Sequence, residues 1–144
     1  MNIALSTKDS NTNYIYFLEP IKNIIINNSK FIIIIYSNNL LTLNGIYVMC
    51  NIDIKNNFNN EELLLYIINL EDHILSKYSK QKIHNYKIRE YFNNNFININ
   101  FDKYYNNKSN IVKYILKISG IWESNNNIGI TFKFLRVNSL LSIC

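Results

Sequence analysis

Basic residues are concentrated in the second half of this chain, where aromatic residues lie between them. Residues 1–76 carry four lysines and seven acidic residues, a net charge of −3. Residues 77–144 carry eleven basic and three acidic residues, a net charge of +8. Cations contact phosphates and flat rings stack on exposed bases, so this pattern indicates binding to single-stranded nucleic acid. A solvated basic face on an ordinary domain is the alternative explanation.

Several residues of this half are candidates for the contact. Lys113, Lys117 and Lys133 fall on the polar faces of two expected strands, and pairing of these strands would form a basic stripe on a sheet. Trp122 ends the first of these strands, where it either stacks on a base or closes the end of a barrel. The remaining candidates precede the strands: Lys87, Arg89, Lys103, Tyr104 and Tyr105.

No set of residues indicates catalysis, a metal or a cofactor, and we expect a protein that is not an enzyme. The chain has three glycines and no P-loop, and His73 and His84 have no cysteine near them. Cys50 lies in an expected strand, where a buried structural thiol is the simplest interpretation. Glu71 and Asp72 are adjacent in sequence, and a solvated helix face explains them.

The elements that position the candidates begin with β segments. The run 31–36 is apolar throughout, which is typical of a strand buried on both faces. Residues 41–43 and 46–54 flank Asn44-Gly45, a strong hairpin signal. A helix is expected over about 61–78, capped by Asn59 or Asn60, with an apolar stripe that contains Leu64, Ile67, Ile68, Leu75 and Tyr78.

The segment 81–110 is the hardest to interpret. Residues 83–92 fit either a helix or a strand, and residues 96–101 fit a short strand. Two strongly alternating strands follow, at 112–122 and 129–137, on either side of an Asn-rich turn. About three β segments, one helix and two β segments are therefore expected in one domain over residues 1–144. This is the element order of an OB-fold, a mainly β (α+β) five-stranded Greek-key barrel with its helix between strands three and four. Other small α+β domains share the same order.

The closing strands carry a motif. Ile118-Ser119-Gly120-Ile121-Trp122, an Asn-rich turn and then residues 128–134 resemble the C-terminal hairpin of OB-fold single-stranded DNA-binding proteins of viruses and virus-like elements. With the size of the chain and its strong Asn and Ile bias, which is typical of an A/T-rich genome, the chain most resembles the single-stranded DNA-binding proteins of the yeast cytoplasmic linear killer plasmids.

The resemblance implies a protein that coats single strands during protein-primed replication in the cytoplasm. Its matching positions are Gly120, Trp122, Gly129, Thr131 and Lys133; it implies DNA contact for Trp122 and Lys133, and glycines that shape the hairpin. One departure is that functional relatives usually end in an acidic tail, whereas residues 140–144 are mostly apolar.

We therefore expect a cytoplasmic protein that binds single-stranded DNA without strong sequence preference and has no membrane partner. RNA as the ligand, a homo-oligomer and contacts with replication proteins stay open. The alternative is a structural or accessory interaction protein, such as a virion component or a subunit of a viral replication or transcription complex. A small enzyme acting on nucleotides is the weakest interpretation.

Overall fold

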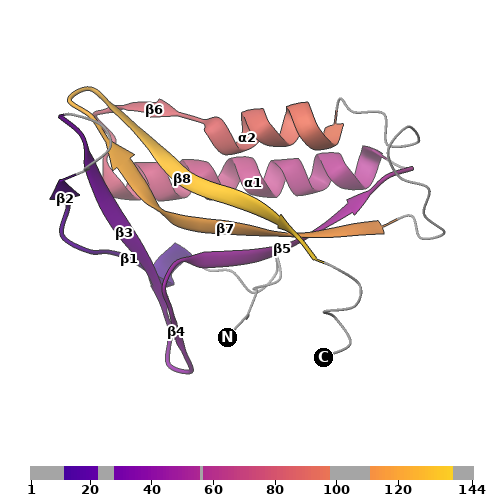
Figure 1. The fold of residues 1–144 in the computed structure, drawn as a ribbon, viewed down its shortest axis with the longest axis horizontal. Helices are drawn as coiled ribbons and strands as arrows, with labels where there is room; N and C mark the ends of the chain where they lie inside the picture. Colours follow the sequence, from indigo (N-terminus) through magenta and orange to yellow (C-terminus); the bar gives the residue numbers. More distant parts are fainter. Residues whose placement is uncertain (1–11, 23–27, 56, 98–110, 138–144) are drawn as a thin grey trace.

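The computed structural model describes residues 12–22, 28–55, 57–97 and 111–137. They form a sheet with two α-helices along one side (Figure 1). The elements are η1 (Thr12–Tyr14), β1 (Ile15–Phe17), β2 (Ile21–Lys22), β3 (Lys30–Ser37), β4 (Thr42–Leu43), β5 (Ile46–Asp53), α1 (Asn57–Tyr78), β6 (Ile83–Asn85), α2 (Lys87–Phe92), η2 (Asn93–Ile97), β7 (Ile111–Glu123) and β8 (Asn127–Arg136).

The sheet is built around β7. One edge of β7 pairs with two strands in succession, β5 along its first part and β3 along its last. Its other edge pairs with β8, and β6 joins β8 in the parallel direction. The path β1-β3-β7-β8-β6 is open and curled, so the expected mainly β, α+β class is confirmed. The described residues differ from the expected five strands and one helix, because they contain eight strands, a long helix after the fifth strand and a second α-helix.

Alternation along the strands separates a helix-facing side from an open side. Ile32, Ile34 and Tyr36 of β3 are buried, while the residues between them are only half-buried, so the expectation of a strand buried on both faces is wrong. Every second residue of β5, from Ile46 to Ile52, is buried in the same core. Burying such side chains is worth roughly 1.5–3 kcal/mol each. The helices cover this side, and no described helix covers the other.

Helix α1 begins at Asn57, four residues before its expected start, and ends at Tyr78 as expected. Asn60 is thus inside the helix and not at its N-cap. The core face of α1 consists of Ile67, Leu70, Glu71, Ile74 and Leu75, with Asn60 buried near its beginning. Two of the expected stripe residues, Ile67 and Leu75, are on this face.

The predicted hairpin at Asn44-Gly45 is wrong. β4 pairs instead with β3, through a turn in which the Asn38 side chain accepts hydrogen bonds from the N–H groups of Leu40 (2.8 Å) and Leu41 (3.0 Å). Asn44-Gly45 forms a corner that carries the chain from β4 into β5, which pairs with β7. Gly45 has φ +115°, and a Cβ there would lie 2.7 Å from the carbonyl oxygen of Ile118. Both constraints favour glycine.

The ambiguous segment 83–92 contains both structures, the strand β6 and the helix α2. The strand expected at 96–101 is wrong at its start, because Phe96 and Ile97 lie in a π-helical turn, and its other residues are outside the described ones. The Phe96 ring is buried against the rings of Phe92 (5.1 Å between centroids) and Tyr114 (4.8 Å). These contacts hold the segment against the helix-facing side of the sheet.

Candidate nucleic-acid interface

Three lysines form a basic stripe on the open side of the sheet. Lys117 of β7 lies directly opposite Lys133 of β8, and Lys113 shares their face because it lies four residues before Lys117 in the same strand. Across the other edge of β7, Lys113 is opposite Asn51 and Lys117 is opposite Tyr47. The predicted pairing of the two strands and the shared face are thus confirmed.

The three lysines give this stripe a positive charge. Among the described residues, none of the three lysines forms an ion pair with a carboxylate. The Lys117 ammonium lies 5.7 Å from the centre of the Tyr47 ring. Like charges directly opposite each other destabilise a sheet, so Lys117 and Lys133 create a local positive potential that a bound anion would relieve.

Trp122 lies on the same face because of a β-bulge. The β7–β8 register shifts between Ile118 and Gly120, which reverses the alternation, and Trp122 then falls opposite Gly129. A Cβ on Gly129 would lie 2.4 Å from the indole Cζ2, so the indole is seated on this glycine.

The Phe31 ring also packs on a glycine. It is the cross-strand neighbour of Trp122, and its ring covers Gly120, where a Cβ would lie 2.7 Å from the ring Cζ. The two glycines of the hairpin motif therefore hold two aromatic rings on the open side. Sequence reasoning missed Phe31 because its continuous apolar run gave no signal for which residues face outward.

Two of the other candidates, Lys87 and Arg89, are not part of this surface. Lys87 and Arg89 are on α2, on the helix side of the sheet. Lys87 is exposed and lies 3.5 Å from Glu90. Lys103, Tyr104 and Tyr105 lie outside the described residues. The structure thus places Lys113, Lys117, Lys133 and Trp122 on one side of the sheet, with Lys113 and Trp122 near opposite ends of β7.

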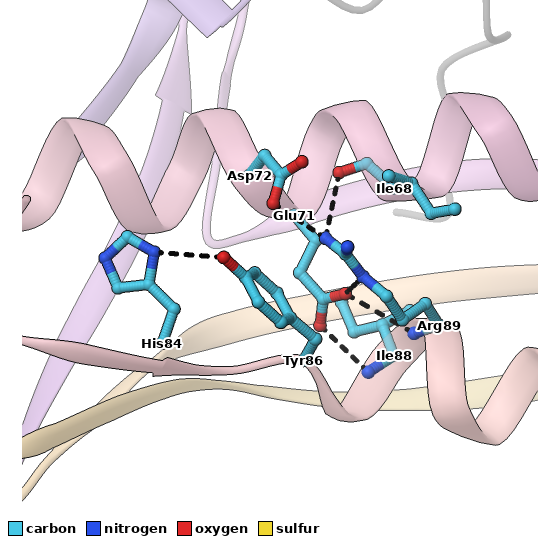
Figure 2. A network of polar contacts seen from close by, with 7 residues as sticks. All are labelled: Ile68, Glu71, Asp72, His84, Tyr86, Ile88 and Arg89. Carbon is cyan, nitrogen blue, oxygen red and sulfur yellow. Dashed lines mark hydrogen bonds and ion pairs between the residues drawn. The ribbon is translucent and has the colours of Figure 1, made fainter.

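Arg89 is part of a polar network between the two helices (Figure 2). Its Nε donates to Glu71 at 2.9 Å and its Nη2 donates to Asp72 at 2.8 Å. The Tyr86 ring lies 3.8 Å from the guanidinium. Burial works to lower the pKa of Arg89, but the hydrogen bonds and charges of the two carboxylates raise it overall.

Glu71 is fully buried, so the expectation of a solvated helix face is wrong for this residue. Besides Arg89 Nε, it accepts hydrogen bonds from the backbone N–H groups of Ile88 (2.9 Å) and Arg89 (3.4 Å) at the start of α2. A carboxylate at a helix N-terminus also interacts favourably with the helix dipole. Glu71 therefore fixes α2 against α1, and this network is structural.

Burial raises the pKa values of two further ionisable groups, Cys50 and Tyr78. Cys50 is buried, and the loss of solvation raises the pKa of its thiol to about 12, against a smaller opposing hydrogen bond from the Leu116 backbone, which confirms a structural thiol. Burial and the hydrogen bond to Glu123 (2.9 Å) raise the pKa of Tyr78 to about 12.

Glu123, the partner of Tyr78, also forms an ion pair of 2.8 Å with Lys82.

In the part of the chain that the structure describes, no group of three or more His, Cys, Asp or Glu residues is placed to hold a metal ion. None of the described helices is long and apolar enough to cross a membrane. Comparison of the chain with family models, curated proteins and solved structures gave no match.

Proposed function

We propose that the chain is a non-catalytic protein that binds single-stranded DNA through the open side of its sheet, with little dependence on sequence. The observation that carries this proposal is the direct opposition of Lys117 and Lys133 without a described acidic partner. As part of the same proposal, the curled sheet is an open relative of the OB-fold. Its cellular role is then to protect single strands during replication of an A/T-rich virus-like element in the cytoplasm.

The basic stripe supplies the phosphate contacts. It lies on β7 and β8, neighbouring strands about 4.8 Å apart, so a flexible single strand can reach all three lysines. Binding would release counterions from the phosphates and would relieve the repulsion between Lys117 and Lys133.

The aromatic residues supply the base contacts. A ring seated on a glycine has one face covered by the backbone, and its opposite face is the one that a base can stack on. Trp122 and Phe31 are arranged in this way beyond the bulged end of the stripe. Stacking of this kind is worth roughly 1–3 kcal/mol per base and is indifferent to base identity.

A titration of the protein into a labelled oligonucleotide of about 30 bases tests the proposal, with a duplex of the same sequence beside it. Trp122 is the chain's single tryptophan, so quenching of its fluorescence reports on stacking directly. We expect salt-dependent binding to the single strand and weak binding to the duplex.

Variants then locate the site. Each lost phosphate contact reduces the salt slope for a single strand by about 0.7, so Lys117→Ala with Lys133→Ala is expected to reduce it by about 1.4. Lys87→Ala removes a cation on the helix side, the same charge change as either single substitution, and is the control that is expected to leave the slope nearly unchanged. Absence of single-strand binding at low salt contradicts the function, and equal effects of all three substitutions contradict the site.

A further inference from the structure

Strand β5 has one edge paired with β7 and an outer edge that no described strand pairs with. All eight residues of β5 take part in the pairing with β7. At the end of this edge, the Asn60 side chain of α1 accepts a hydrogen bond from the Asp53 N–H and donates one to the Asp53 carbonyl, both at 2.8 Å. The Asp53 backbone groups therefore point away from β7.

This geometry fixes the direction of the neighbouring backbone groups. Residues two apart in a strand direct their N–H and C=O groups to the same side. Those of Asn51, Met49 and Tyr47 consequently point to the outer edge with those of Asp53. The Asn60 carboxamide makes the two bonds that one residue of an added strand would make, and the ladder stops after it.

A cavity lies beside this unfinished edge. Its volume is about 240 Å³, and it separates the edge of β5 from the first turns of α1. The lining residues are Met49 and Asn51 of β5 with Asn59, Glu62, Leu63 and Tyr66 of α1. The helix residues are spaced by three and four positions, so they form one helix face turned to the strand edge.

We propose that this edge binds an extended peptide segment of a partner protein, which adds a strand beside residues 47–51 and places a lysine or arginine in the cavity. The backbone of the segment continues the ladder that Asn60 begins. The aliphatic part of the basic side chain packs on Leu63 and Tyr66, and its charged end reaches the Glu62 carboxylate. This binding is independent of the nucleic-acid interface.

Charge favours a basic foreign segment over a second copy of this chain. Glu62 lines the cavity and is exposed, and Glu61, which precedes it in α1, is exposed as well. Pairing of β5 with β5 of another copy would bring the glutamates of both copies toward one another. A cationic segment meets the opposite situation, because its charge is complementary to Glu62.

The probes for the test are three pools of labelled octapeptides. Each has randomised Val, Ile, Thr and Tyr positions around one fixed central residue, which is lysine, glutamate or norleucine. We expect the lysine pool to bind at least tenfold more tightly than the glutamate pool. Selected binders with N-methylated alternate amides are expected to lose binding, because the ladder bonds are then missing. Amide exchange at Met49 and Asn51 is expected to slow by tenfold or more in the complex.

Paired substitutions locate the charge recognition. Glu62→Gln is expected to weaken the lysine pool several-fold, and Glu62→Lys to reverse the preference between the lysine and glutamate pools. Glu61→Gln removes the same charge one residue away from the lining residues and is expected to change the affinity less than twofold. Both positions are exposed, so the variants are expected to fold as the parent does.

Four outcomes overturn the proposal. They are equal or absent binding of the lysine and glutamate pools, indifference to N-methylation, equal effects of Glu61→Gln and Glu62→Gln, and protection of Met49 that depends on protein concentration without peptide. The last outcome assigns the edge to a second copy. Since oligonucleotide binding is measured separately on the same variants, failure here is distinguishable from failure of the single-strand interface.

Discussion

Replacing Glu71 by alanine is expected to destabilise the protein by about 3 kcal/mol, the lower end of the range for breaking a buried ion pair. The carboxylate is fully buried, and three hydrogen bonds from Arg89 and the backbone of α2 end on it. The value lies at the lower end because the Arg89 side chain is 22% exposed and keeps its contact with Asp72.

Asp72 provides the matched control, because it binds the same guanidinium from a site with 44% exposure. An exposed pair is worth about 0.2–1 kcal/mol, so Asp72→Ala is expected to cost at most about 1 kcal/mol. Urea unfolding followed by circular dichroism measures both values. Glu71→Gln keeps one acceptor and is expected to fall between them.

The reasoning is refuted if Glu71→Ala and Asp72→Ala destabilise equally, because burial would then not determine the strength of the contact. It is also refuted if Glu71→Ala costs less than about 1 kcal/mol with an unchanged urea dependence. A reduced urea dependence would instead show that α2 has already detached in the folded state.

Three further outcomes are expected. Gly129→Ala should displace the Trp122 indole, because the new Cβ would lie 2.4 Å from it, and should shift the tryptophan emission; an unchanged spectrum argues against the seat. In a variant with its C-terminal cysteine replaced by serine, Cys50 should react with a thiol reagent at pH 8 only after unfolding, since it is buried and its thiol has a pKa of about 12. Burial works to raise the pKa of Glu123, but its bonds to Lys82 and Tyr78 lower it overall, so its contribution to stability is complete above the ordinary carboxyl pKa of 4.5 and is lost as the pH falls through the lower folded value. Glu123→Gln should flatten the acid limb of the stability profile; an identical limb in both proteins contradicts the pairing.

The basic stripe could be predicted because it depends on one local regularity. Alternation places Lys113 and Lys117 on one face of a strand, and an Asn-rich turn makes antiparallel pairing with the strand of Lys133 the simplest connection. The face of Trp122 could not be predicted in this way. It depends on the bulge at Ser119, which appears in the register with β8 and in no local pattern.

The polar network shows a different limit. Glu71 lies three or four residues from Ile67 and Ile74, so its position within the apolar stripe of α1 was visible in the sequence. Its partner Arg89 was not, because α2 reaches Glu71 only after the chain has reversed through β6. A carboxylate within an apolar stripe should therefore prompt a search for a distant cation.

The place of β7 in the sheet has a consequence for how the chain folds as it is synthesised. Ile46 pairs with Ile118 and Ile32 pairs with Ile121, so β3 and β5 pair with a strand that is synthesised long after both of them. Contacts so distant in sequence form slowly, and apolar strands without partners are prone to aggregate in the meantime. We expect the nascent chain to require protection, and truncation before β7 to yield an insoluble product and not a smaller folded unit.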